Sequence, residues 1–197
     1  MRLNIVLNNM IDKENSWDDK LTIGEKFEQE SIKFINEKYP LAHKFHSENS
    51  TELKYYDIII PELSNNGIVG VECKYDEEAL NSNNLCIEIK CNDVKSGLHA
   101  TKSKYWLHCD GNKTYLALTD KIKELVRIEY HEKLQKFIDE TNEPGELLRI
   151  RLDTNYKLQQ KKGEYKFMDW YLIPKDLFAS YCLEVNDISE MTYNNLI

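Results

Sequence analysis

The sequence has little glycine and proline, seven and four in 197 residues, so collagen-like and linker-like chains are excluded. Long hydrophobic runs are also lacking: no apolar stretch approaches the ~20 residues that a membrane-spanning helix needs. The first eight residues, MRLNIVLN, hold too short an apolar stretch for a signal peptide. We therefore expect a cytoplasmic chain with no membrane partner.

The cysteines are five in number and include no paired C-x-x-C motif. They are Cys73, Cys86, Cys91, Cys109 and Cys182. This spacing is not typical of structural zinc. An odd set of cysteines without an export signal is typical of reduced thiols in the cytoplasm.

The charge balance is acidic, with 34 Asp and Glu against 26 Lys and Arg, a net charge of −8. Such a chain disfavours loose, whole-surface attraction to nucleic acid, but it is compatible with a local basic patch or a carboxylate cluster that binds divalent metal. Length and an apolar content of 41% indicate one globular domain over residues 1–197.

Hydrophobic periodicity predicts a helix over residues 22–35, with Thr22 as its N-cap and Glu25 completing a capping box. A short helix running into a strand is expected over residues 100–107, and a long helix capped by Thr119 should extend to about residue 138. Strands are predicted at residues 55–61, 68–75, 85–91, 114–118, 147–152 and 167–173, and a last short helix at Pro174.

The order of these elements predicts an α/β fold in which helices flank a mixed central β-sheet. The Asn-Gly turn at residues 66–67 makes the strands on either side of it antiparallel. The core is expected over about residues 20–120, with the C-terminal helix and strands packed on it.

Asp57, Glu72 and Lys74 are the strongest chemical signal. Glu72 and Lys74 are two apart on a strand, so their side chains leave the same face. The residues before Glu72 are Ile-Val-Gly-Val, apolar on both faces, and a charge on such a central strand must be paired or bound to metal. Two carboxylates on adjacent strands suit Mg²⁺ or Mn²⁺, and a lysine beside them can orient water or stabilise charge on a phosphate.

Asp57 followed about fifteen residues later by Glu72-Cys73-Lys74 resembles the D…(D/E)-x-K signature of the PD-(D/E)XK nuclease superfamily. Residues 24–28, GEKFE, resemble the first-helix motif of that superfamily, and residues 96–106, SGLHATKSKYW, are similar to a segment of its phage-type members. The resemblance covers roughly residues 20–120. The proline that usually precedes the Asp is Tyr56 here.

The resemblance implies a restriction-endonuclease-like core and a Mg²⁺-dependent nuclease that hydrolyses phosphodiester bonds. Asp57, Glu72 and the Cys73 carbonyl would hold the metal, and Lys74 would orient the attacking water. Glu28, or alternatively Glu25, would complete the site from the helix. The implied setting is the cytoplasm of a bacterium or of a phage-infected host cell.

Several residues have alternative interpretations. Glu88-Ile89-Lys90 is a second E-x-K on a strand, which can be a solvated outer face, an auxiliary carboxylate beside the site or the catalytic pair itself. His43 and His46 at strand-like spacing are either site ligands or exposed residues. Asp76 either extends the acidic site or caps the end of its strand.

A basic segment over residues 90–113 holds five lysines against two aspartates. Of these, Lys102 and Lys104 are the predicted nucleic-acid contacts, because cations beside a nuclease site would bind the phosphate backbone. A second basic cluster, at residues 157–166, has the pattern of a hairpin around Gly163.

Three functions are compatible with these patterns. The first is a metal-dependent nuclease acting on DNA, for which a homodimer would allow paired cuts. The second is a non-catalytic nucleic-acid-binding or interaction domain of the same fold. The third is an RNA-cleaving enzyme, which no RNA-recognition motif supports. The intact set Asp57, Glu72 and Lys74 favours the first.

Overall fold

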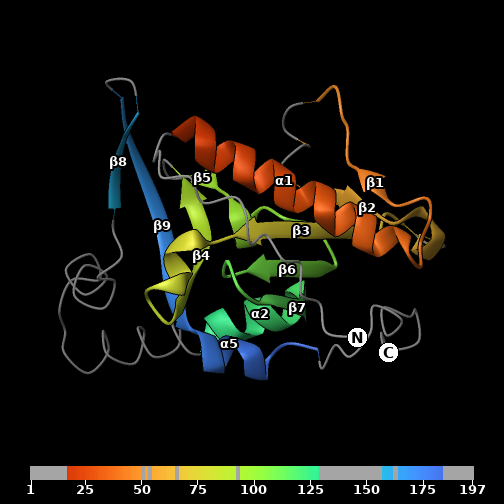
Figure 1. Cartoon of the computed structure of the whole chain (residues 1–197). Coiled ribbons are helices and arrows are strands. Elements are labelled where there is room, and N and C mark those ends of the chain that lie inside the picture. The colour runs from red at the N-terminus through yellow and green to blue at the C-terminus, as the bar shows by residue number, and fades with distance from the viewer. Residues whose placement is uncertain are drawn as a thin grey trace.

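A computed structural model describes residues 17–49, 52, 55–64, 67–91, 94–128, 157–161 and 164–183 (Figure 1). For residues 17–22, 157–161 and 164–169 only the backbone is described. Within these ranges the chain forms a mixed α/β fold with two sheets.

The first sheet is five-stranded and mixed, in the order β1-β2-β3-β6-β7. Its strands are β1 (His43–Lys44), β2 (Ile58–Ile59), β3 (Gly70–Tyr75), β6 (Tyr105–Cys109) and β7 (Thr114–Leu118). β3 pairs antiparallel with β2 and parallel with β6. It is therefore the central strand that the apolar run before Glu72 predicts.

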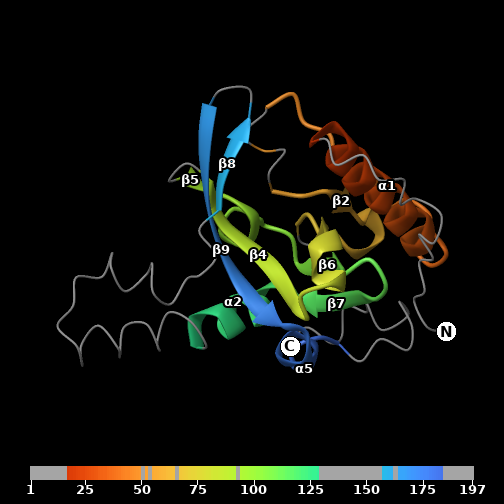
Figure 2. The ribbon, with the colours of Figure 1, turned by 60° about the vertical axis from the view of Figure 1, so that its left-hand side comes forward.

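The second sheet is antiparallel, in the order β5-β4-β9-β8. Its strands are β4 (Asn84–Cys91), β5 (Val94–Lys95), β8 (Lys157–Lys161) and β9 (Glu164–Pro174). Short 3-10 helices connect the strands: η1 (Pro61–Leu63), η2 (Glu77–Leu80) and η3 (Gly97–His99). In Figure 2, β4 and the long β9 lie side by side, as their register requires.

The two faces of the first sheet have different covers. On one face α1 (Trp17–Asn36) places Phe27 and Ile35 against Val71, Cys73 and the odd-numbered residues of β6. On the other face Trp106 packs with the buried side of β4 and with α2 (Thr119–Val126) and α5 (Lys175–Ser180). Figure 1 shows α1 on the opposite side of the first sheet from α2 and α5.

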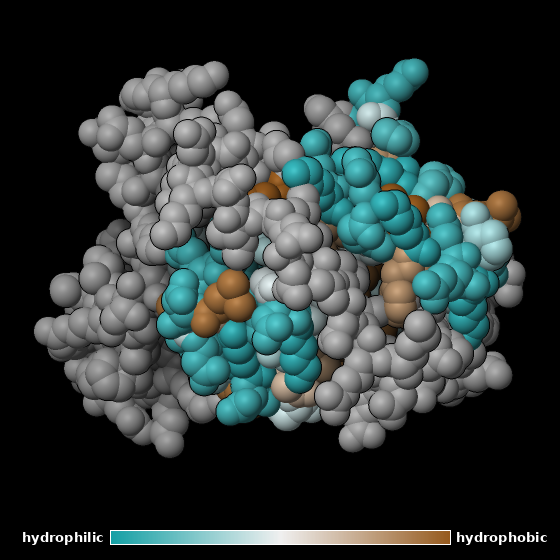
Figure 3. Space-filling model, in the orientation of Figure 1, coloured by the Kyte–Doolittle hydropathy of each residue, from teal (hydrophilic) through white to brown (hydrophobic). Residues whose placement is uncertain are grey.

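The alternation of β3 decides where its polar residues lie. Val71 and Cys73 face α1, so Glu72 and Lys74 lie on the opposite face, the one turned toward Trp106. Hydrophilic side chains dominate the described surface over α1 in Figure 3, consistent with a helix whose other side is buried on the sheet.

The structure confirms several predicted elements. β4 alternates as expected, with Leu85, Ile87 and Ile89 buried. β2 and β3 are antiparallel, and the second basic cluster forms the β8–β9 hairpin. α5 follows Pro174, its N-cap residue.

Other boundaries were wrong. α1 begins at Trp17, so Thr22 lies inside it and is not its N-cap. The strand expected at residues 55–61 is shorter in the structure, where it is β2. It ends before Pro61 because that residue begins η1. Of the short helix running into a strand expected over residues 100–107, the strand is confirmed as β6, but the helix is wrong, because η3 ends at His99.

The helix that follows β7 also differs from the prediction. Its N-cap is Leu118, and Thr119 Oγ1 has no hydrogen-bond partner among the described residues. The expected continuation of that helix beyond residue 128 and the strand at 147–152 lie outside the described residues. In the described part of the chain, no helix is long and apolar enough to cross a membrane.

Candidate functional site

Asp57, Glu72 and Lys74 come together on one face of the first sheet. Ile58 pairs with Val71 in the antiparallel register, which places Asp57 across from Glu72. The three residues meet around β3, the central strand of the sheet. Glu72 is 4% exposed, and its Oε1 lies 2.6 Å from Lys74 Nζ.

A main-chain donor fixes the Asp57 carboxylate. The N–H of Cys73 donates to Asp57 Oδ2 at 2.7 Å. Burial and the nearby Glu72 carboxylate raise the pKa of Asp57 to about 7, although Lys74 and the Cys73 N–H act in the opposite direction. Two carboxylates held this close create a local demand for positive charge.

Lys74 supplies part of that charge. Burial alone would lower the pKa of Lys74, but the carboxylates of Glu72 and Asp57 raise it above its ordinary value, so the side chain stays cationic. Its ammonium also lies 5.9 Å from the centroid of the Trp106 ring. The side chain remains 33% exposed, so the ammonium can reach a substrate while it holds Glu72.

Glu28 lies on α1, which covers the face of the first sheet opposite to Glu72 and Lys74. Its side chain is 19% exposed, and its negative charge adds to the raised pKa of Asp57. Glu25, the alternative helix carboxylate, is exposed. Of these two helix carboxylates, Glu28 is therefore the one whose charge acts on the pKa of Asp57.

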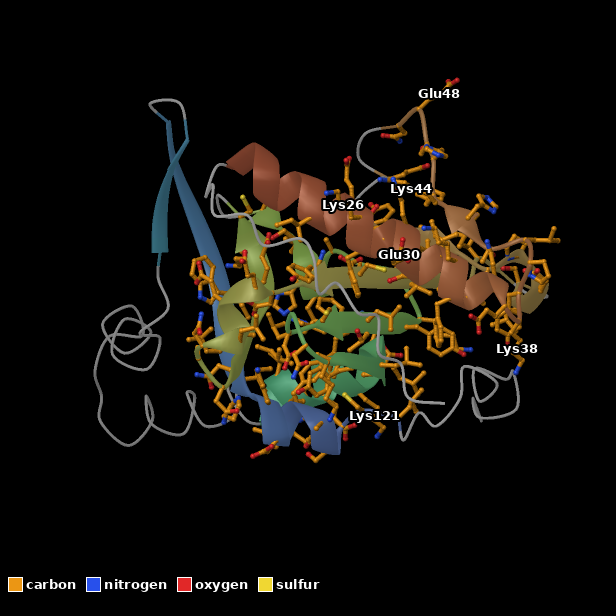
Figure 4. The ribbon with its side chains drawn as sticks, in the orientation of Figure 1. Lys26, Glu30, Lys38, Lys44, Glu48 and Lys121 are labelled. Atoms are coloured by element: carbon orange, nitrogen blue, oxygen red, sulfur yellow. The ribbon has the colours of Figure 1, made fainter. Side chains whose placement is uncertain are left out.

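Lys44 is a neighbour of the site that sequence reasoning missed. Its Nζ lies 2.8 Å from Glu28 Oε2, and Figure 4 shows Lys44 close to the middle of α1. The hydrogen bond to Glu28 and the charge of Asp57 raise the pKa of Lys44, although burial acts in the opposite direction. Lys44 belongs to no motif in the sequence. The only feature that could have pointed to it is its place in the strand before Asp57.

The segment that leads into Asp57 is anchored by residues 101–103. The carbonyl of Tyr55 accepts from Thr101 Oγ1 at 3.1 Å, from Ser103 Oγ at 3.1 Å and from the Lys102 N–H at 3.0 Å. Thr101 and Ser103 are both 4% exposed. These two hydroxyls therefore position the chain two residues before Asp57.

Lys102 and Lys104, the predicted nucleic-acid contacts, lie next to this anchor. Lys102 is exposed, and its ammonium lies 3.8 Å from the centroid of the Tyr55 ring. Lys104 is half-buried, which lowers its pKa, and its N–H donates to the Gly70 carbonyl. Lys102 therefore lies between the two anchoring hydroxyl residues, and Lys104 is hydrogen-bonded to β3 through its main chain.

The second E-x-K is on the outer side of β4. Glu88 and Lys90 are half-buried and alternate with the buried residues of that strand. Glu88 nevertheless raises the pKa of Lys74, so it lies within electrostatic range of the site. This arrangement supports Glu88 as an auxiliary carboxylate, with Glu72 and Lys74 as the central pair.

The remaining candidates have local structural roles. Asp76 caps η2 by accepting from the Ala79 N–H, and it also accepts from the Cys86 N–H at 2.7 Å. His43 and His46 are exposed, and His43 Nδ1 lies 2.7 Å from the Leu41 carbonyl. Burial raises the pKa of the Cys73 thiol well above its usual value, so this thiol is protonated in the metal-free chain.

The donor set fits a hard divalent cation. Mg²⁺ is commonly held by one or two carboxylates and keeps several waters. Asp57 and Glu72 are such a pair, and Asp57 Oδ1 accepts no hydrogen bond from the residues that the structure describes. In the same residues, no group of three or more His, Cys, Asp or Glu side chains is gathered closely enough to hold a metal.

No family model matches the chain, and neither a curated protein nor a solved structure gives a significant match. The case for a function therefore depends on the residues and their geometry.

Proposed function

We propose that the protein is a metal-dependent nuclease that hydrolyses phosphodiester bonds of DNA, with a restriction-endonuclease-like core. The observation that carries the proposal is the ion pair between the buried Glu72 and the half-buried Lys74, next to an Asp57 carboxylate whose pKa is raised to about 7. Burying these charges costs free energy of folding, so an ion pair of this kind is weak evidence for a role in stability. Charged groups with strongly shifted pKa values are more typical of functional sites.

The sheet supports the same proposal. Asp57, directly before β2, and Glu72 and Lys74 on the adjacent β3 occur in the order that the superfamily signature requires. In the sheet, β3 is followed by the parallel β6. α1, which carries Glu28, packs against β3.

Each residue has a distinct role in hydrolysis. Asp57 and Glu72 would hold Mg²⁺ or Mn²⁺, which lowers the pKa of a coordinated water and offsets charge on the scissile phosphate. Lys74, fixed by Glu72, orients the attacking water and stabilises negative charge that develops on the phosphate. The Cys73 N–H holds the Asp57 carboxylate in place throughout.

The test is cleavage of linear, supercoiled and branched DNA with Mg²⁺, with Mn²⁺ and with EDTA. Wild-type protein should cut at least one of these substrates only when a metal is present. Lys74→Ala should reduce the rate by about 10²–10³-fold, the usual cost of one lost electrostatic group. The matched control is Lys90→Ala, the lysine of the second E-x-K, which should cut at nearly the wild-type rate.

Two results would contradict the proposal in different ways. If Lys90→Ala were inactive and Lys74→Ala active, the second E-x-K would be the catalytic pair. If the wild-type protein bound DNA but cut none of the substrates with either metal, the alternative of a non-catalytic nucleic-acid-binding domain would hold.

A further inference from the structure

Two aromatic residues of β6, Trp106 and His108, lie beside the two charged residues of β3. In the parallel register Glu72 is paired with Trp106, and the next pair on the same face joins Lys74 to His108. Side chains two apart leave the same face of a strand, so all four lie on the face of the sheet opposite to α1. Trp106 and His108 are both fully buried. They are therefore the buried neighbours of the ion pair on this face.

A hydrogen bond joins these two rings. The indole Nε1–H of Trp106 donates to Nδ1 of His108 at 3.3 Å. A buried indole N–H usually needs a hydrogen-bond partner, and Trp106 has no exposed surface at which solvent could supply one. His108 therefore satisfies the indole and restricts rotation of its ring.

The acceptor role requires one form of His108. A neutral imidazole has one N–H and one acceptor nitrogen, so a His108 that accepts at Nδ1 carries its proton on Nε2. Nε2 lies 3.9 Å from Asp76 Oδ2, which is beyond hydrogen-bond distance, but a carboxylate on that side favours the proton there. Asp76 is itself fixed by the N–H groups of Ala79 and Cys86. Burial lowers the pKa of His108, against the carboxylates of Asp76 and Asp110, so the ring is neutral near pH 7.

The Trp106 ring is in turn the aromatic neighbour of Lys74. Lys74 Nζ lies 5.9 Å from the centroid of that ring, within the range of a cation–π interaction, and 2.6 Å from Glu72 Oε1. These two contacts define where the half-buried ammonium lies. A rotation of the indole would remove one of them.

We propose that His108 is a positioning residue of the candidate site. As an Nε2–H imidazole it holds the indole of Trp106, and this ring holds the ammonium of Lys74 at the place from which it acts on the attacking water. The catalytic consequence depends on the proposed function, but the form of His108 and the placement of Lys74 can be measured without cleavage.

The first test reads the form of His108 in the wild-type protein. Long-range ¹H–¹⁵N NMR spectra of the metal-free, full-length chain at pH 7 distinguish the two neutral forms of each of the five histidines. His108 should be neutral with its proton on Nε2. A proton on Nδ1 would overturn the proposal whether or not the protein cuts DNA, because Nδ1 could then accept nothing from Trp106.

The second test asks whether the hydrogen bond places Lys74. His108→Asn keeps an acceptor oxygen near the position of Nδ1, whereas His108→Leu has none. Both variants lose the imidazole ring, so a difference between them in the chemical shifts of the Lys74 ε-methylene protons reports the ring current of Trp106. The shifts should differ between the two variants. Identical shifts would overturn the proposal.

The third test is a cleavage assay. His108→Leu should lower kcat by about tenfold and leave KM near the wild-type value, because Lys74 acts on charge that develops in the transition state. His108→Asn should restore most of the rate.

Leu125→Ala is the matched control for the cleavage assay. Leu125 lies on α2 in the same buried cluster as Trp106, so its truncation should lower the urea midpoint while kcat stays near the wild-type value. Equal losses of kcat in His108→Leu and Leu125→Ala would mean that His108 acts only on stability, and the proposal would be wrong. If the wild-type protein cut no DNA while both NMR results were as expected, only the proposed nuclease activity would be contradicted.

Discussion

The main-chain N–H of Cys73 donates to Asp57 Oδ2 at 2.7 Å, so the residue between Glu72 and Lys74 also fixes the third member of the site. One short segment of β3 therefore supplies two side chains on one face and an anchoring amide. Because the anchor is main chain, it does not depend on the identity of residue 73.

The first prediction separates the amide of Cys73 from its thiol. Cys73→Ala should keep DNA cleavage and Mn²⁺ binding, since the N–H remains, and should lower the free energy of unfolding by about 1 kcal/mol through lost packing against α1. Asp57→Asn should retain the fold because its amide oxygen can still accept, but should abolish cleavage and weaken Mn²⁺ binding measured by calorimetry. A folded but inactive Cys73→Ala protein would mean that the thiol itself takes part.

The second prediction concerns Gly70, which lies beneath the Tyr56 ring. A Cβ at residue 70 would clash with Tyr56 Cδ1, and that ring packs edge-on against Phe45. Gly70→Ala should therefore cost about 1–3 kcal/mol of unfolding free energy and, by displacing Tyr56, should reduce cleavage. Urea denaturation and a cleavage assay measure the two effects.

Gly24→Ala is the matched control for Gly70. Gly24 lies inside α1, and a Cβ there would meet nothing within 4 Å. This substitution should stabilise the protein by about 0.5–1 kcal/mol because alanine is the better helix former. Equal destabilisation by both substitutions would show that the crowding at Tyr56 is not the cause.

The local pattern of residues 68–91 was sufficient to predict the central strand and the shared face of Glu72 and Lys74. Strand alternation has a period of two, and a buried charge among apolar residues is informative wherever it occurs. The same alternation also predicted which residues of β4 are buried and which face outward.

Contacts between distant segments could not be predicted in this way. The Tyr55 carbonyl meets Thr101 and Ser103, which are more than forty residues away in the chain, and Lys44 reaches Glu28 across the face of α1. Such pairs depend on register and packing, which a single sequence does not encode as a local pattern. Helix starts were also missed, because Asp18 and Asp19 at the first turn are a weaker signal than an apparent capping box at Thr22.

The third prediction tests the ion pair between Lys44 and Glu28. The Lys44 side chain is 43% exposed, so solvent screening limits the pair to about 0.5–1 kcal/mol. A double-mutant cycle with Lys44→Ala and Glu28→Gln should give a coupling energy of this size in urea denaturation. Lys26→Ala with Glu28→Gln is the control cycle, and its coupling should be smaller. Additive effects of Lys44→Ala and Glu28→Gln would contradict the pairing.

The fourth prediction is a pH dependence of stability in metal-free protein. The folded pKa of Asp57 is about 7, above the ordinary 3.8, so the folded state binds more protons between these values. The free energy of unfolding should then fall as pH rises from about 4 to about 7, by at most about 4 kcal/mol. Asp57→Asn should remove this loss, which denaturation in EDTA at several pH values will measure.

Asp110 is the control of opposite sign. Burial acts against its ionisation, but Lys175, 2.8 Å away, and the N–H groups of Lys113 and Asn112 lower its pKa. Its contribution to stability is present above the ordinary pKa of about 3.8 and is lost as pH falls through the lowered value. Asp110→Asn should therefore destabilise the protein at neutral pH.

The Asp57 prediction has its own contradicting outcome. If the stability of Asp57→Asn varied with pH in parallel with that of the wild type, the raised pKa of Asp57 would be contradicted.

The last prediction concerns the salt dependence of DNA binding. If Lys102 and Lys104 contact phosphates, the wild-type plot of log K against log salt should be steep despite the net charge of −8. Each lost phosphate contact reduces the slope by about 0.9 for duplex DNA, so replacing both lysines by alanine should flatten it by one to two units. Fluorescence anisotropy in EDTA measures binding without cleavage.

Lys121 and Lys123 provide the matched control for this double substitution. They lie on α2 and pair with Glu124 and Asp120 of the same helix. Figure 4 shows Lys121 on the opposite side of the first sheet from α1. Because their removal leaves the segment next to Asp57 unchanged, the slope should stay at the wild-type value. An equal loss of slope in both double variants would mean that binding responds only to total charge. If the slope of the Lys102→Ala, Lys104→Ala double variant were unchanged, these lysines would not contact phosphates, and the DNA-binding surface would lie outside the segment that anchors Tyr55.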